Sequence, residues 1–149
     1  MRNDRKSILV LCTGNSARSQ MAEGLLKHIC QAEYEVNSAG TKPGIVRPEA
    51  IKVLAEMNID ISMNRSKSID EFADREIDFV LTVCDNAKEN CPYFPARTKL
   101  IHHAFEDPAD AEGTEKERLT AFRKVRDQIK EYLPEFLGEI STPAETRTK

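Results

Sequence analysis

A cysteine and an arginine stand six positions apart at the end of an apolar stretch, and together they could hold and attack an oxyanion. Cys12 follows the run Ser7–Leu11, and Arg18 opens a segment with helical periodicity. A tight loop that leads into a helix N-terminus directs several backbone N–H groups at one point, and a guanidinium suits two oxygens of a tetrahedral anion. The same positive field favours a thiolate over a thiol. We therefore interpret Cys12 as a nucleophile beside an oxyanion site.

The residues around this pair complete the predicted anion-binding loop, which consists of Thr13, Gly14, Asn15, Ser16, Ala17, Arg18 and Ser19. Gly14 is expected to allow a backbone conformation that other residues resist, and Asn15 to brace the loop through local hydrogen bonds. Ser19 is placed to hydrogen-bond the sulfur of Cys12. The alternative is a buried structural cysteine with a surface arginine, because the spacing alone is a weak signal.

Two more cysteines follow another apolar run. Cys84 comes directly after Phe79–Val83, and Cys91 lies seven positions further on. Across a helix this spacing spans roughly 10 Å, whereas the Cα atoms of a disulfide lie about 4.4 to 6.8 Å apart, so a helical segment must unwind before the two thiols can pair. A packing role for Cys84 is the alternative. A zinc site is not expected, since the spacing is wrong and no second pair of ligands completes a tetrahedron.

An acid–proline pair is the third chemical feature. Pro108 restricts the backbone of Asp107 to extended conformations, which could hold its carboxylate toward the loop as a general acid. A simple turn is the alternative, and Glu106 is the nearest competing acid. His102 and His103 are interpreted as structural or solvent-facing rather than catalytic.

The elements that must position these side chains alternate between strand and helix patterns. The runs expected to form strands are Ser7–Leu11, Tyr34–Ser38, Phe79–Val83 and Thr98–His102. Such alternation indicates right-handed crossovers and a parallel sheet, whose ligands bind beyond the carboxyl ends of the strands. Cys12, Cys84 and Asp107 all follow strand ends.

Three helical patterns lie between or after these strands. Their expected inward faces are Met21, Leu25, Leu26 and Ile29, then Ala50, Val53, Leu54 and Met57, and in the last helix Leu119, Phe122, Val125, Ile129 and Leu133. The last helix opens with a capping box, Thr114 and Glu117. Pro134 is expected to kink or interrupt it, and the tail after about residue 140 to fray. Cys30 ends the first helix and is interpreted as packing.

Composition narrows the class of protein. A chain of 149 residues fits a single domain spanning 1–149, and 22 Lys and Arg against 25 Asp and Glu leave no basic excess for a nucleic-acid partner. No run approaches the roughly 18 apolar residues of a membrane span, and the N-terminal segment does not read as a secretory signal. We expect a monomeric cytoplasmic protein, in which cysteines are catalytic, redox-active or buried.

Four motifs together carry a family resemblance. They are C-T-G-N-S-A-R-S-Q-M-A-E-G from Cys12, N-S-A-G-T from Asn37, V-C-D-N-A-K-E-N-C-P from Val83 and H-H-A-F-E-D-P-A from His102. The chain resembles the low-molecular-weight tyrosine phosphatase fold, and more closely its thioredoxin-coupled arsenate reductase branch, from about Lys6 to the final helix. The resemblance implies an α/β three-layer sandwich with a four-stranded parallel sheet flanked by helices.

The resemblance also implies a mechanism without a bound cofactor. The Cys12 thiolate displaces an oxygen of arsenate, with Asp107 as the acid. Cys84 then attacks the Cys12 sulfur and releases arsenite, and Cys91 moves the disulfide to Cys84–Cys91, which thioredoxin reduces. Glutaredoxin or a small thiol could serve instead of thioredoxin. One departure from the family pattern is a pair of cations, Arg65 and Lys67, where some members hold a monovalent cation, which argues against bound potassium here.

Two other functions remain open from the sequence. A small phosphatase could use Cys12, Arg18 and Asp107, although the aromatic residues that would clasp a phosphotyrosine ring are missing after Pro108, where Ala109–Ala111 follows. Weak phosphatase side activity is expected in either case, because phosphate and arsenate share shape and charge. The third possibility is a non-catalytic oxyanion-binding or thiol-sensing regulator.

Overall fold

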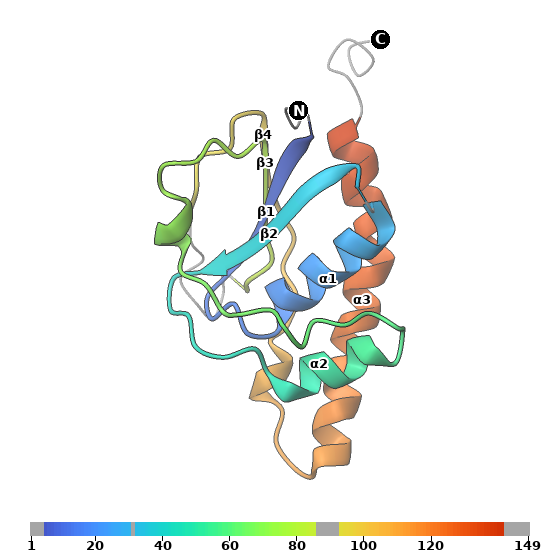
Figure 1. Cartoon of the computed structure of the whole chain (residues 1–149). Coiled ribbons are helices and arrows are strands. Elements are labelled where there is room, and N and C mark those ends of the chain that lie inside the picture. The colour runs from blue at the N-terminus through green and yellow to red at the C-terminus, as the bar shows by residue number, and fades with distance from the viewer. Residues whose placement is uncertain (1–4, 31, 86–92, 142–149) are drawn as a thin grey trace.

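The computed structural model describes residues 5–30, 32–85 and 93–141, which form strands and helices in alternation (Figure 1). In chain order the elements are β1 (Lys6–Cys12), α1 (Arg18–Cys30), β2 (Tyr34–Gly40), α2 (Pro48–Ala55), the 3-10 helix η1 (Ile69–Phe72), β3 (Phe79–Thr82), β4 (Lys99–His102), the 3-10 helix η2 (Pro108–Asp110) and α3 (Glu115–Ser141). All four predicted strands are present within one or two residues of their expected ends.

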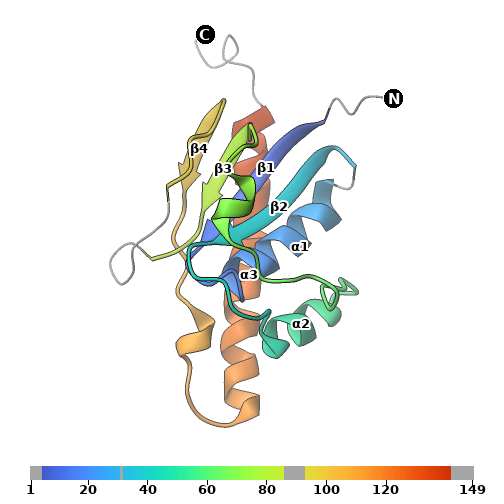
Figure 2. The ribbon, with the colours of Figure 1, turned by 60° about the vertical axis from the view of Figure 1, so that its left-hand side comes forward.

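The four strands form one parallel sheet in the order β2-β1-β3-β4 (Figure 2). The strand β1 is central, and its register sets Leu11 opposite both Ala39 and Thr82. The carboxyl ends of β1, β3 and β4 therefore meet at one edge of the sheet, where the predicted nucleophile, the second cysteine and the acid-bearing segment follow.

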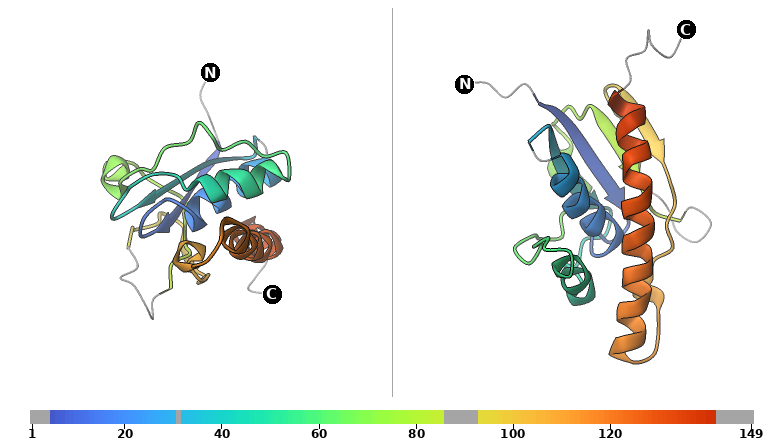
Figure 3. Two further views of the ribbon diagram at one scale, coloured as in Figure 1. Left: turned by 90° about the horizontal axis from the view of Figure 1, so that it is seen from below. Right: turned by 90° about the vertical axis from the view of Figure 1, so that its right-hand side faces the viewer.

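Alternate residues of the central strands face two separate apolar clusters. Ile8, Val10 and Leu81 pack with residues of α1, α2 and α3, and in Figure 3 α3 runs alongside both of the other helices. Leu9 and Val80 point the other way, toward a smaller cluster supplied by η1 and the chain around it. The three-layer α/β prediction is confirmed: α1, α2 and α3 pack in the cluster on one face of the sheet, and η1 with the chain around it forms the layer on the other face.

Two predicted core positions lie at helix ends and differ from expectation. Ile29 is 40% exposed, while Cys30 next to it is buried at the last position of α1. Met57 lies beyond the end of α2 and is only partly buried. The reason is the same in both cases, because a helix that ends or turns no longer carries its periodic face toward the core.

The long helix α3 begins as predicted. The backbone N–H of Thr114 donates to Glu117 Oε1 at 2.8 Å, and the N–H of Glu117 donates to Thr114 Oγ1 at 3.1 Å, so both halves of the capping box are made. Of the two outcomes predicted at Pro134, a kink or an interruption, the interruption is wrong, since the helix continues to Ser141. Fully buried neighbours at Leu133 and Phe136 hold this stretch against the core, and such packing outweighs the lost backbone hydrogen bond.

Within the described ranges, no helix is both long enough and apolar enough to cross a membrane.

Candidate active site

Cys12 is the last residue of β1, and its sulfur is buried at the foot of the predicted loop, with 2% of the residue exposed. The backbone N–H of Asn15 donates to Sγ at 3.3 Å, and Ser19 Oγ lies 2.8 Å from the same sulfur. The predicted contact between Ser19 and Cys12 is therefore present. A backbone N–H and a hydroxyl thus both contact this sulfur.

Asn15 holds the loop in place through all of its amide hydrogen-bonding capacity. Its Nδ2 donates to Ser19 Oγ at 2.8 Å and to Ser38 Oγ at 2.9 Å, while its Oδ1 accepts from the backbone N–H of Lys67 at 2.7 Å and from Gln20 Nε2 at 3.0 Å. The side chain is fully buried. It thereby anchors the loop to α1, to β2 and to the segment before η1.

The backbone conformation that the loop requires falls on Asn15, whose φ is 49°, and not on Gly14 as expected. Asparagine tolerates this left-handed region better than most residues, and the four hydrogen bonds stabilise it there. The glycine that the loop does need is Gly40, at the end of β2. A Cβ at Gly40 would collide with the carbonyl oxygen of Thr13 and approach the backbone nitrogen of Asn15 to 2.9 Å.

Arg18 joins the loop to the segment after β4. It is the first residue of α1, and only 3% of it is exposed. One terminal nitrogen donates to the carbonyl oxygen of Phe105 at 3.3 Å, and the other lies 3.5 Å from Asp107 Oδ2. The structure thus brings the predicted guanidinium and the predicted acid together from positions 89 residues apart.

Asp107 has the extended backbone that Pro108 predicts, with φ −83° and ψ 111°. Its Oδ1 accepts the backbone N–H of Ala109 at 3.0 Å, which caps η2, while Oδ2 faces Arg18. The side chain is 30% exposed, so it is open to solvent beside the loop. A carboxyl group in this position can exchange a proton with water and with a bound oxyanion.

The competing acid points elsewhere. The Glu106 carboxylate pairs with Lys124 of α3 at 4.0 Å, and its side chain is exposed. Asp107 is therefore the acid that the structure places beside Arg18.

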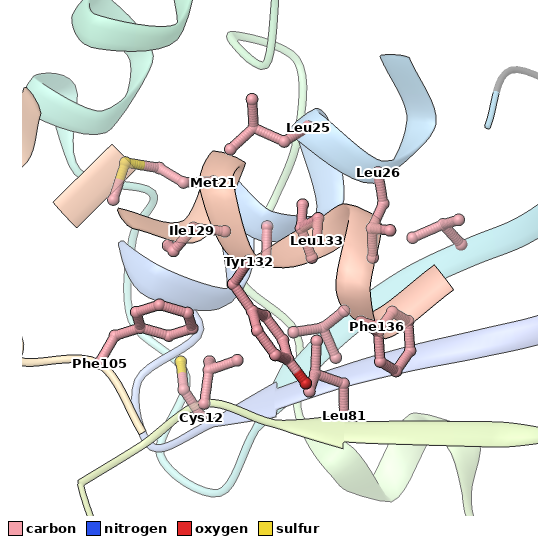
Figure 4. Packing of buried hydrophobic residues seen from close by; sticks show 14 of the residues in the cluster. Cys12, Met21, Leu25, Leu26, Leu81, Phe105, Ile129, Tyr132, Leu133 and Phe136 are labelled. Carbon is pink, nitrogen blue, oxygen red and sulfur yellow. The ribbon is translucent and has the colours of Figure 1, made fainter. Parts of the chain in front are cut away.

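The two histidines have structural contacts, as predicted. His102 Nδ1 lies 2.6 Å from Thr82 Oγ1, and the His103 ring lies 3.9 Å from that of Tyr132 between centroids. Tyr132 and Phe105 belong to the same buried cluster as Cys12 (Figure 4). Burial, and to a smaller extent Glu139 and Glu135, raises the pKa of Tyr132 to about 12, so its phenol stays neutral at physiological pH.

Cys84 follows β3 at the same edge of the sheet as Cys12. The backbone N–H of Val83 donates to the carbonyl oxygen of Leu11 at 2.9 Å, which attaches the residue before Cys84 to the residue before Cys12. Both cysteines are buried in one cluster. Cys91, the third predicted member, lies outside the described residues, as does most of the segment between them.

Cys30 differs from Cys12 in its surroundings. Burial, with a smaller effect of Glu33, raises the pKa of its thiol to about 11. A thiol of this kind is a weak nucleophile near neutral pH, which agrees with the packing role expected for it.

Two polar residues belong to the site although the sequence analysis did not place them there. Gln20 Nε2 donates to the backbone oxygen of Arg65 at 3.0 Å as well as to Asn15, and Ser66 Oγ donates to the carbonyl oxygen of Gly14 at 2.9 Å. Gln20 is fully buried in the first turn of α1, a property that only the structure reveals.

Arg65 and Lys67, the two cations noted in the sequence, point in different directions in the structure. Arg65 extends outward and pairs with Glu71 at 2.7 Å, whereas Lys67 Nζ turns inward, to 3.9 Å from Glu23 Oε1. Among the described residues, no three His, Cys, Asp or Glu side chains gather as ligands for a metal ion.

Comparison with known proteins places these observations in a family. Residues 7–146 match the model of the family described as low molecular weight phosphotyrosine protein phosphatase. A protein of Oceanobacillus iheyensis named arsenate reductase is 49% identical over 125 residues, which cover 84% of this chain and 90% of that protein. An arsenate reductase of Bacillus subtilis is 44% identical over 133 residues, covering 89% and 96%.

A solved structure described as an arsenate reductase in the oxidized state superimposes with a TM-score of 0.75 at 31% identity, and the match covers 91% of this chain and 98% of that one. The agreement therefore extends from the motif at Cys12 to the arrangement of the whole sheet. The family match spans nearly the full chain, and the chain belongs to the low molecular weight phosphotyrosine protein phosphatase family.

Proposed function

We propose that this protein is an arsenate reductase that works through Cys12, Cys84 and Cys91 and is regenerated by thioredoxin. The observation that carries the proposal is the attachment of Val83 to Leu11, because it brings a second buried cysteine to the strand end where the nucleophile lies. A phosphatase of this fold needs one thiol, whereas reduction of an oxyanion by two electrons needs a second thiol. Relatives that are 44% to 49% identical and carry the name arsenate reductase support the same conclusion.

The first step uses the loop and the acid. Arsenate binds at the N-terminus of α1, where backbone N–H groups and the Arg18 guanidinium stabilise its negative charge. The Cys12 thiolate attacks arsenic and forms a sulfur–arsenic bond. One arsenic–oxygen bond breaks, and Asp107 gives the departing oxygen a proton so that it leaves as water.

The second step is the reduction. Cys84 is disulfide-bonded in the structure, so this step belongs to the reduced protein. There the Cys84 thiolate attacks the Cys12 sulfur, and the electron pair of the sulfur–arsenic bond passes to arsenic. Arsenic is thereby reduced from the +5 to the +3 state and leaves as arsenite, while the two cysteines are oxidised to a disulfide. Cys91 then attacks Cys84 and frees Cys12, and the dithiol of thioredoxin reduces the Cys84–Cys91 bond.

The described contacts support the assignment of Cys12, Arg18 and Asp107 to these roles. The Cys12 sulfur accepts the backbone N–H of Asn15 and lies in hydrogen-bond contact with the Ser19 hydroxyl, and the Arg18 guanidinium lies beside Asp107. Weak hydrolysis of small phosphomonoesters should accompany reduction, since phosphate fits the same donors. The residues after Pro108, Ala109 to Ala111, offer no aromatic ring for a phosphotyrosine.

The test is arsenate-dependent oxidation of NADPH in the presence of thioredoxin and thioredoxin reductase. Wild type should turn over many times, and Cys91→Ser should release about one arsenite per protein and then stop. Cys30→Ser is the matched control and should behave as wild type. Titration of free thiols after one turnover without reductant should show the loss of two thiols. Loss of none, together with hydrolysis of para-nitrophenyl phosphate, would identify a phosphatase instead.

A further inference from the structure

A buried carboxylate lies behind the loop and has no part in the steps above. Glu23, in the second turn of α1, is 3% exposed. Its Oε1 accepts the hydroxyl of Ser38 at 2.5 Å, and its Oε2 lies 2.8 Å from Lys27 Nζ. Lys67 Nζ lies 3.9 Å from Oε1. Burying a charged group is costly unless it is paired, so this arrangement calls for a function.

A continuous chain of hydrogen bonds links this carboxylate to the sulfur of Cys12. Ser38 joins Glu23 to Asn15, and Asn15 joins Ser38 to Ser19, which contacts the sulfur. All five residues are buried. A change of charge at Glu23 can therefore alter the electrostatic potential at the Cys12 sulfur through buried groups that solvent does not screen.

One backbone group determines the orientation of the Asn15 amide at the middle of this chain. The N–H of Lys67 can only donate, and it lies 2.7 Å from one end of the Asn15 amide, so that end must be the oxygen. The opposite end is then the nitrogen, which donates to both serine hydroxyls. The ionised carboxylate of Glu23 can only accept, so the Ser38 hydroxyl donates to it. A thiolate likewise can only accept, so in the thiolate form of Cys12 the Ser19 hydroxyl donates to the sulfur.

A hydroxyl that donates to the sulfur stabilises the Cys12 thiolate, whereas the negative charge of Glu23 at the other end of the chain destabilises that thiolate. An uncompensated carboxylate behind the loop would repel both the Cys12 thiolate and a bound oxyanion. Two lysines contact Glu23 and differ in exposure. The side chain of Lys27 is 52% exposed, so solvent screens its charge, whereas that of Lys67 is 12% exposed.

The pKa of Lys67 is lowered overall, chiefly by desolvation. Glu23 is the main charge that opposes this shift; Arg65 and Lys27 lower the pKa further, and Glu71 raises it slightly. Arg65 and Glu71 pair with each other at the surface. On the Cys12 side of the chain, the charged groups that face the loop are Arg18 and Asp107.

We propose that Lys67 is a positioning residue for Cys12: its ammonium compensates Glu23, so that the chain through Ser38, Asn15 and Ser19 delivers a hydroxyl proton to the sulfur without a net negative charge behind it. The inference rests on the proposed role of Cys12 as nucleophile. Lys67 acts at two points of the chain, at its middle through the backbone N–H on Asn15 and at its Glu23 end through the ammonium.

The test is the pH profile of Cys12 alkylation by iodoacetamide, followed for the Cys12 peptide by mass spectrometry. Lys67→Met keeps the backbone donor and removes the charge. It should move the half-maximal pH upward by about 0.5 to 1 unit and slow alkylation at pH 6 by roughly three- to tenfold. Lys67→Arg should retain most of the wild-type profile. Lys27→Met is the matched control and should shift the profile by less than about 0.3 unit.

The decisive variant is the double substitution Glu23→Gln with Lys67→Met, which removes both charges and keeps an acceptor for Ser38. If compensation is the role of Lys67, the double variant should return to within about twofold of wild type. An unchanged profile in Lys67→Met, or a double variant as slow as the single one, would overturn the proposal. Should Lys67→Met fail to fold, Lys67→Gln removes the same charge and is measured in its place, with the same expected shift. Alkylation needs neither arsenate nor thioredoxin, so its outcome is separate from that of the proposed function.

Discussion

The two sides of the site are held in different ways. On one side, the loop from Cys12 to Arg18 is largely buried, and Asn15 uses every hydrogen bond its amide can make. On the other side, Asp107 is 30% exposed and meets Arg18 at 3.5 Å, the outer limit of a hydrogen bond. The side that must stabilise charge is preorganised, whereas the side that moves a proton remains open to water. This division suits catalysis, because fixed donors need no rearrangement and an acid must exchange its proton.

The largest effect should come from the sulfur itself. Cys12→Ser should reduce arsenate reduction by at least about a thousandfold, because a serine hydroxyl is a poor nucleophile and cannot form a disulfide. The initial rate of the thioredoxin-coupled assay measures this.

Cys30→Ser provides the contrast within the same buried cluster and should stay within about twofold of wild type. Alkylation resolved by peptide should also label Cys12 near pH 7, while Cys30, with its pKa raised to about 11, should react only as the pH approaches that value. Rapid labelling of Cys30 at neutral pH would remove the distinction between the two thiols.

The next largest effect on activity concerns Asp107, on the side of the site that is open to solvent. Asp107→Asn should lower kcat by about a hundredfold, since the amide cannot give a proton to the leaving oxygen, while the affinity for phosphate as a competitive inhibitor changes little. Glu106→Gln is the matched control, because its carboxylate pairs with Lys124 instead. Equal losses in the two variants would show that charge at this edge, and not one positioned acid, supports the reaction.

The smallest of these effects concerns stability on the preorganised side. Gly40→Ala should lower the free energy of unfolding by about 1 to 3 kcal/mol, because the added Cβ collides with the backbone of Thr13. Gly14→Ala should change it by less than about 0.5 kcal/mol, since its Cβ would meet the flexible end of Ser16 at 3.3 Å and the backbone oxygen of Lys42 at 4.0 Å, an ordinary contact distance. Urea denaturation of both variants measures the difference. A reversed order would mean that the loop relaxes more freely than its hydrogen bonds suggest.

Much of the fold could be predicted because it depends on neighbours along the chain. The apolar runs predict the strands, the capping box at Thr114 predicts the start of α3, and Pro108 predicts the extended backbone of Asp107. Helix ends were less predictable. Ile29 is exposed although it continues a periodic face, and Pro134 lies inside an unbroken helix because Leu133 and Phe136 are packed on either side.

The same distinction between local patterns and contacts from distant segments applies to the site. The types and spacing of Cys12, Arg18 and Asp107 were sufficient to propose an oxyanion site, since each follows a strand end or opens a helix. The choice of Asn15 over Gly14 for the left-handed position required contacts from Ser38 and Lys67.

The sequence by itself therefore determined the elements, the reactive residue types and the edge of the sheet where they gather. Only the tertiary structure decided which side chains hold the loop, which glycine it cannot lose and which lysine reaches Glu23. The physical reason is distance along the chain. Local patterns act through neighbouring residues, whereas the contacts of the site join segments up to 89 positions apart, and only the register of the parallel sheet brings such segments together.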